Sequence, residues 1–135
     1  MSKSDENANS FITVLDDPDT IIRKFKRAVT DSEACVRFAE GKDGVNNLMG
    51  IYSSITGRRM EEIEREFDGK GYGDFKPTVA EAVIEELRPI QERYRNLIAD
   101  KAYLEQCYRE NAPKAQAIAR RTLSKVMKKI GYLPL

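Results

Sequence analysis

Apolar side chains recur at helical spacing along most of this sequence, and this periodicity restricts the fold more than any other feature. One such stripe consists of Val45, Leu48, Met49, Tyr52 and Ile55. Repeats of three and four residues place side chains on one face of an α-helix. Gly57 follows directly and is a typical helix stop. The only β-prone run is residues 11–15, which predicts either a strand or an extended connector.

Helix boundaries can be predicted at several other places. Asp17 followed by Pro18 indicates an N-cap and the first helical position. A short helix is expected around Met60, Ile63 and Phe67. The glycine-rich run 69–73 predicts a tight turn, since its three glycines remove backbone restraint.

Prolines subdivide the second half of the chain. Thr78 with Glu81 predicts a capping box at the start of the longest helix. Pro89 would remove a helical hydrogen bond there, so a kink or a junction of two helices is expected. Asn111 and Pro113 predict the start of the last helix. Its inward face is expected to consist of Ala115, Ala119, Leu123, Val126 and Ile130.

These patterns predict an all-α fold, a helical bundle of five to seven helices with a short extended N-terminal segment. The 135 residues suffice for one domain. There is no internal repeat, and no apolar run is long enough to cross a membrane. Cys35 and Cys107 match no metal spacing and are expected to be buried free thiols in a reducing compartment.

Charge is nearly balanced overall but unevenly distributed. The net charge is +1, so no global basic field attracts nucleic acid. After Glu110 there is no acidic residue, whereas six lysines and arginines follow. The last helix could therefore be a solvated face, an RNA-backbone contact or a docking element for an acidic surface.

Few residues can support catalysis within the chain. Histidine is absent, and no cysteine stands beside a base, so nucleophilic and general-base candidates are lacking. The glutamates at 61–66 are best explained as a solvated helix face. No metal site is predicted. A small complete enzyme is therefore the weakest interpretation.

The start of the chain offers one chemical motif. Ser2, Lys3 and Ser4 combine two hydroxyl donors with a compact ammonium in a polar run. Such a run can hold phosphate oxygens, although the tetrapeptide alone is equally compatible with an ordinary polar terminus.

The motif gains meaning from the segments that follow it. These are MSKSDENAN at 1–9, RAVTDSE at 27–33, DGVNNLMGIYSSITG at 43–57, EFDGKGYGDFK at 66–76 and RPIQERY at 88–94. In order and spacing they resemble the C-terminal portion of bacterial-type tryptophanyl-tRNA synthetase, a class I aminoacyl-tRNA synthetase. The chain would begin inside the KMSKS signature, without its first lysine. The resemblance covers nearly the whole chain.

The resemblance implies a function and a division of the chain. The family activates tryptophan with ATP and Mg²⁺ and transfers it to tRNA. Residues 1–16 would be the remnant of the KMSKS loop and a connector, residues 17–110 a helical anticodon-binding domain, and residues 111–135 a basic helix that packs back toward the catalytic domain. Because the N-terminal Rossmann domain and its HIGH-type signature are missing, this part alone is expected to be inactive and to bind no cofactor.

The resemblance also implies site residues and partners. Lys3 would stabilise charge on the pyrophosphate as the catalytic lysine, with Ser2 and Ser4 as further ATP-binding residues. From the residue types, exposed candidates for contacts with tRNA are Arg23, Lys24, Arg27, Arg58 and Arg59. The expected partners are tRNA for tryptophan and the missing Rossmann domain, in the cytoplasm. The parent family is homodimeric, but a monomer stays open for this chain.

The alternative function is a free-standing helical module that recruits a protein partner. A HIGH-type motif and strand–helix repeats encoded upstream of Met1 would favour the synthetase.

Overall fold

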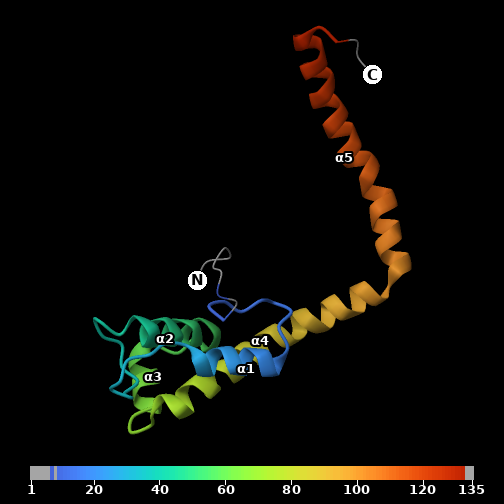
Figure 1. Ribbon diagram of the computed structural model, residues 1–135. Helices are drawn as coiled ribbons and strands as arrows, with labels where there is room; N and C mark the ends of the chain where they lie inside the picture. The colour runs from blue at the N-terminus through green and yellow to red at the C-terminus, as the bar shows by residue number, and fades with distance from the viewer. Residues whose placement is uncertain (1–6, 8, 133–135) are drawn as a thin grey trace. The chain divides into compact units, whose positions relative to one another are not determined.

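The computed structural model describes residue 7 and residues 9–132. Its five helices are α1 (Pro18–Arg27), α2 (Asp43–Thr56), α3 (Met60–Glu66), α4 (Tyr72–Ala99) and α5 (Lys101–Ile130) (Figure 1). The described residues include no strand, so residues 11–15 form a connector. The prediction of an all-α fold is confirmed.

The chain divides into two compact units, Met1–Glu92 and Arg93–Leu135, hereafter unit 1 and unit 2. Unit 1 contains α1, α2, α3 and most of α4, which lie around a common core in Figure 1. The largest fully buried side chains of this core are Phe75, Ile21, Met49, Ile63, Val45 and Val79. Phe67 contacts both Tyr52 and Phe75 edge to face, with ring centroids 6.1 Å and 4.9 Å apart.

Several predicted helix ends are confirmed. The Asp17 side chain accepts a hydrogen bond from the Thr20 backbone N–H (2.9 Å), and Pro18 is the first residue of α1. Gly57 ends α2 in the left-handed conformation, with φ of 72°. That backbone geometry favours glycine because other residues carry a Cβ that crowds the following carbonyl.

Other predicted boundaries are wrong. Tyr72 and Gly73 already belong to α4, so Thr78 lies inside the helix and its hydroxyl donates to the Asp74 carbonyl (2.9 Å) instead of capping. Helix α4 continues through Pro89, so no junction of two helices falls there, and α5 continues through Pro113, which is therefore not the start of a helix. The break between the two helices falls at Asp100, whose side chain caps α5 by accepting from the Tyr103 N–H (2.9 Å).

The expected inward face of the last helix is also wrong for the described residues. No side chain of α5 is buried, and Leu123, Val126 and Ile130 are exposed. The thiol of Cys35 is exposed and that of Cys107 is half-buried, which corrects the expectation of two buried thiols. None of the helices described here is both long and apolar enough to span a membrane.

Candidate functional site

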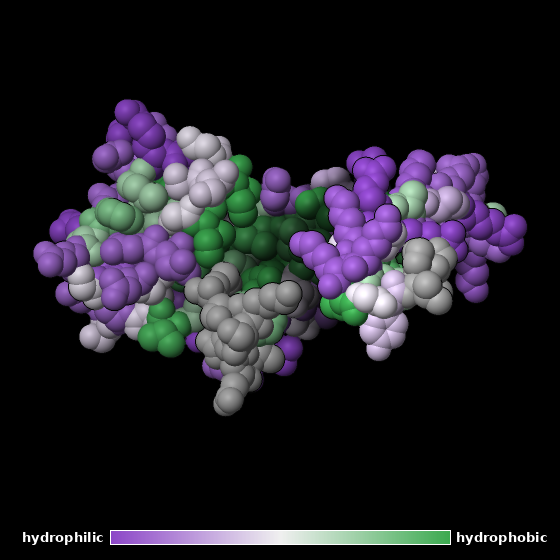
Figure 2. All heavy atoms as spheres, turned by 90° about the horizontal axis from the view of Figure 1, so that it is seen from above, coloured by the Kyte–Doolittle hydropathy of each residue, from purple (hydrophilic) through white to green (hydrophobic). Residues whose placement is uncertain are grey.

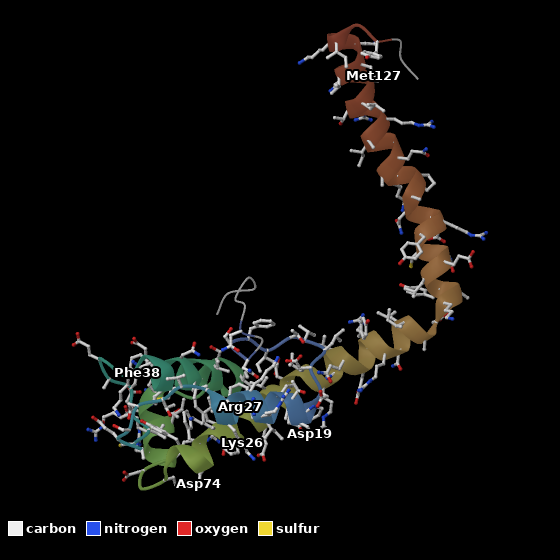
Figure 3. The ribbon with its side chains drawn as sticks, viewed as in Figure 1. Asp19, Lys26, Arg27, Phe38, Asp74 and Met127 are labelled. Carbon is white, nitrogen blue, oxygen red and sulfur yellow. The ribbon has the colours of Figure 1, made fainter. Side chains whose placement is uncertain are left out.

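The predicted RNA-binding arginines lie in two separate places on unit 1. Arg23 and Arg27 are exposed on α1, one helical turn apart. Arg58 and Arg59 immediately precede α3. No hydrogen bond or ion pair within the described part of the chain joins the two groups. Figure 3 shows Arg27 beside Lys26, a further exposed cation at the end of α1.

The expected exposure of Lys24 is wrong, because this residue is buried. Only 8% of the residue is exposed, and its Nζ lies 2.6 Å from Oδ2 of Asp16. The ammonium also lies 5.3 Å from the ring centre of Phe11. Lys24 follows Ile21 by three residues and so shares the apolar face of α1. Its charge is paired with that of Asp16 inside unit 1.

The two arginines before α3 are exposed but already paired. Arg58 forms an ion pair with Glu66 and lies against the Tyr52 ring, 5.9 Å from its centre. Burial raises the pKa of the Tyr52 hydroxyl, and the Glu66 carboxylate raises it further. The Arg59 guanidinium lies 3.2 Å from Glu62, whose carboxylate accepts the Arg59 backbone N–H (3.0 Å). These carboxylates reduce the net positive charge available to a phosphate at this place.

The loop between α1 and α2, residues 28–42, is held from several sides. From α4, the Tyr72 hydroxyl lies 2.8 Å from both Asp31 carboxylate oxygens and 3.0 Å from the Cys35 carbonyl. Lys76 of the same helix donates to the Ala28 carbonyl (2.8 Å). The RAVTDSE and GKGYGDFK segments of the sequence therefore contact each other directly.

Helix α2 and its N-cap residue hold the same loop from a second side. A Cβ at Gly44 would lie 2.1 Å from the Val29 carbonyl oxygen, so only glycine permits this approach. The Asn46 side chain bonds both the N–H and the carbonyl of Ala39 (3.2 and 2.7 Å). Lys42, the N-cap of α2, forms ion pairs with Asp31 (3.2 Å) and Glu33 (2.6 Å).

These contacts set the charge states of the loop. Burial would raise the pKa of Asp31, but hydrogen bonds from Tyr72, the Glu33 N–H and Lys42 outweigh it and lower that pKa. The hydrogen bond to Glu33 is the main cause that raises the pKa of Lys42. The loop is thus anchored by ionised groups that stay charged through the neutral range.

The anchored loop exposes residues that the sequence-based candidate set omitted. Phe38 is 50% exposed and Val29 is 86% exposed, and Figure 3 shows Phe38 on this loop. The Phe38 N–H is fixed by the Glu64 carboxylate of α3 (2.8 Å). Arg37 stands beside Phe38 and lines a groove of about 230 Å³ with Arg65. Aromatic and guanidinium planes are the surfaces on which unpaired RNA bases stack, so the adjacent Arg37 and Phe38 could have been recognised in the sequence.

The predicted ATP-binding residues Ser2, Lys3 and Ser4 lie outside the described residues. Within the described residues, no cluster of three or more His, Cys, Asp or Glu side chains could hold a metal ion.

Comparison with known proteins identifies relatives along the whole chain. The chain matches tryptophan–tRNA ligases, among them those of Clostridium tetani at 48% identity and Wolinella succinogenes at 49%, each over 98% of this chain, and that of Oceanobacillus iheyensis at 50% over 97%. The chain spans only 39% to 40% of the length of these relatives.

A solved structure and a family model agree with these matches. The crystal structure of tryptophanyl-tRNA synthetase from Mycoplasma pneumoniae superposes with a TM-score of 0.70 at 28% identity, covering 98% of this chain and 41% of the other. The model of the family "tRNA synthetases class I (W and Y)" matches residues 1–88. Because this match covers most of the sequence, the chain belongs to the class I tRNA synthetase family of the tryptophan and tyrosine enzymes.

Proposed function

We propose that the chain is the tRNA-recognition part of a tryptophan–tRNA ligase, which activates tryptophan with ATP and transfers it to tRNA. The observation that supports this most is the identity of about half of all residues with tryptophan–tRNA ligases over nearly the whole chain. It favours the ligase over a free-standing module for protein recruitment. The surrounding catalytic machinery would lie in the length of the relatives that this chain does not span.

Residues 1–16 contribute the ATP-binding segment and its connector in this proposal. Lys3 would act as the catalytic cation that stabilises negative charge developing on the pyrophosphate, and Ser2 and Ser4 would donate hydroxyl hydrogen bonds to phosphate oxygens. Mg²⁺ would bind with the ATP and neutralise further phosphate charge. No cofactor is expected to bind this chain alone.

Residues 17–110 would recognise the anticodon end of the tRNA. Arg23 and Arg27 of α1 are exposed and supply positive charge, and Lys26 adds to them. Arg58 and Arg59 offer exposed guanidinium planes, although their charge is paired. The role proposed for Lys24 changes, because its ion pair with Asp16 leaves the ammonium inside unit 1.

Residues 111–135 would pack against the nucleotide-binding domain rather than contact RNA. The exposed apolar side chains of α5, including Leu123, Val126 and Ile130, support this proposal because they form a helix face without a partner in the described chain. The complete enzyme would be a dimer, as the parent family is.

Binding of an RNA hairpin tests the proposal. A fluorescent hairpin with the anticodon stem and loop of tRNA for tryptophan is titrated with the chain, beside a hairpin of equal length with another anticodon. We expect saturable binding that is weaker for the second hairpin. Equal affinity for both would show that the chain lacks anticodon recognition.

A further inference from the structure

Within the loop between α1 and α2, the backbone of residues 35–39 is held in place at both of its ends. The Cys35 carbonyl accepts a hydrogen bond from α4 (3.0 Å), and both backbone groups of Ala39 bond the Asn46 side chain (3.2 and 2.7 Å). Between these points Val36 is buried in the core, with 4% exposed. The segment is therefore ordered before any ligand binds, which lowers the entropy cost of binding there.

Arg37 and Phe38 are exposed side chains of this ordered segment. Phe38 is 50% exposed, and its N–H donates to the Glu64 carboxylate of α3 (2.8 Å). The Arg37 guanidinium is also exposed, and it has no hydrogen bond or ion pair with any residue that the structure describes. Arg58 and Arg59, by contrast, are paired with carboxylates. A planar cation without a partner thus stands next to an exposed aromatic ring.

The groove of about 230 Å³ beside this segment carries charges of both signs. Its lining includes two guanidinium groups, two carboxylates and two apolar side chains, which are Arg37, Arg65, Glu64, Asp68, Val36 and Phe67. Guanidinium groups only donate hydrogen bonds, and ionised carboxylates only accept them. A phosphate would meet the carboxylates as well as the cations. The edge of a nucleobase is uncharged and carries both donors and acceptors, so it fits this lining better.

An apolar groove of unit 1 fits a base less well. It encloses about 260 Å³, and its lining includes Ile12, Val14, Ile51 and Leu87. Figure 2 shows hydrophobic residues gathered in a hollow of the surface. No lysine or arginine is among the described residues that line the apolar groove, so it offers a base edge no cationic donor.

We propose that Phe38 and Arg37 bind one unpaired base of the anticodon loop, with Phe38 as the stacking surface and Arg37 as a donor to the base edge. This inference rests on the proposed function, in which residues 17–110 recognise the anticodon end of the tRNA. Bases in RNA loops can lie on aromatic rings and guanidinium planes. Because every base has a π-face, stacking supplies affinity, and the polar groups of the groove select among bases.

The test of Phe38 is a cycle of protein and RNA changes. The 135-residue chain is titrated with a fluorescent anticodon hairpin and with hairpins that each carry one abasic nucleotide in the loop. Phe38→Leu removes the ring and keeps an apolar side chain, and it should lower affinity for the intact hairpin about tenfold. One abasic hairpin should bind parent and variant equally, because it lacks the base that stacks on Phe38. Phe38→Trp should retain affinity.

The contact of Arg37 is tested separately by its salt dependence. Arg37→Gln changes an exposed side chain without a partner in the described chain, so it keeps the test decisive if Phe38→Leu does not fold. It should weaken binding several-fold and leave the salt slope unchanged, since that slope reports phosphate contacts. A slope reduced by about 0.7 would show that Arg37 binds a phosphate and would overturn its role at the base edge.

Tyr108→Leu is the matched control, because Tyr108 is an aromatic residue of α5 that is 72% exposed. Its affinity for the hairpin should equal that of the parent. An equal loss in Tyr108→Leu and Phe38→Leu would show that the effect is not specific to the segment, and the inference would be wrong.

The remaining outcomes separate the inference from the proposed function. If the parent prefers the tryptophan anticodon but Phe38→Leu loses the same factor with every abasic hairpin, Phe38 stacks on no base. The inference is then wrong and the proposed function stands. The same holds if Phe38→Leu and Arg37→Gln bind like the parent. If the parent binds hairpins with either anticodon equally, the proposed function fails, and the inference fails with it.

Discussion

The expected environment of Lys24 differs from the one in the structure. In the sequence it stands among Arg23, Lys26 and Arg27 and resembles part of a basic surface. In the structure it is buried against Asp16, eight residues earlier in the chain. The helical pattern does place it on the apolar face of α1. Only the fold of the connector shows that the Asp16 carboxylate lies beside that face. A charged residue on a buried face was therefore the available signal.

Lys24→Met should destabilise the chain at pH 7 by about 2 kcal/mol or more, because Asp16 is left half-buried without its cation. The pKa of Asp16 is lowered in the folded state, so its stabilising contribution is present above the unfolded pKa of about 3.9 and is lost as pH falls through the folded pKa. The difference between variant and parent should thus shrink toward acid pH.

Urea unfolding at pH 7 and at pH 3 measures this difference. Lys26→Met is the matched control, since Lys26 is exposed two residues away, and its unfolding midpoint should stay near that of the parent. A Lys24→Met midpoint equal to that of Lys26→Met at pH 7 would contradict the importance of the ion pair.

Gly44 and Gly50 are a matched pair of glycines within α2. Gly44→Ala would place a Cβ 2.1 Å from the Val29 carbonyl oxygen, whereas a Cβ at Gly50 has no neighbour within 4 Å. We expect Gly44→Ala to destabilise by about 2 kcal/mol through overpacking. Gly50→Ala should stabilise by roughly 0.5–1 kcal/mol through helix propensity. Thermal unfolding followed by circular dichroism compares them, and shifts of the same sign would refute the close approach.

At the scale of elements, some local signals predicted helix boundaries correctly and others did not. The N-cap at Asp17 and the stop at Gly57 depend only on neighbouring residues, and both were predicted correctly. Pro89 predicted a kink or a junction of two helices and Pro113 the start of a helix, yet α4 and α5 continue through these prolines. A proline removes one hydrogen bond at a local cost of about 3 kcal/mol, and the many intact bonds of a long helix on both sides can offset it.

The candidate site was predictable only in part, because several of its contacts join residues that are far apart in the sequence. The exposed positions of Arg23, Arg27, Arg58 and Arg59 agree with the sequence pattern. The partners of Arg58 and Arg59 and the anchoring of loop 28–42 by Tyr72 depend on contacts 3 to 41 residues apart. Periodicity within one helix carries no information about such contacts.

The α1 face and the last helix can be separated by RNA binding. Arg23→Ala with Arg27→Ala should weaken binding of the anticodon hairpin several-fold and reduce the salt slope by about 0.7 per lost phosphate contact on a single-stranded loop. Lys128→Glu with Lys129→Glu should have a smaller effect if α5 is a docking element. Titrations at three salt concentrations give both quantities. Loss of binding only in the α5 variant would place the RNA surface on unit 2.

At the scale of the molecule, the two units differ strongly in charge. Unit 2 carries ten Lys and Arg and three Asp and Glu, a net charge of +7, so unit 1 carries −6 of the total of +1. The proposed anticodon surface thus belongs to an acidic unit. Recognition there must depend on base contacts and on a few placed cations rather than on a general positive potential.

The chain alone should not catalyse tryptophan-dependent ATP–pyrophosphate exchange. It has no histidine, and its proposed ATP-binding residues are only Ser2, Lys3 and Ser4. These can bind phosphate but cannot enclose a nucleotide or tryptophan. Isotope exchange with purified chain at high concentration measures this activity. Exchange above the level of a Lys3→Ala control would show that the chain holds more of the active site than proposed.

The opposite charges of the two units have a consequence for how the chain behaves in solution. At its sequence pI of about 7.7 the molecule has no net charge, but unit 1 still carries net negative charge and unit 2 net positive charge. Ion-exchange resins respond to local charge density, so at that pH a cation exchanger should retain the chain through unit 2 and an anion exchanger through unit 1. At low ionic strength unit 1 of one copy can attract unit 2 of another. Salt near 0.15 M, with a screening length of about 8 Å, should dissolve such assemblies.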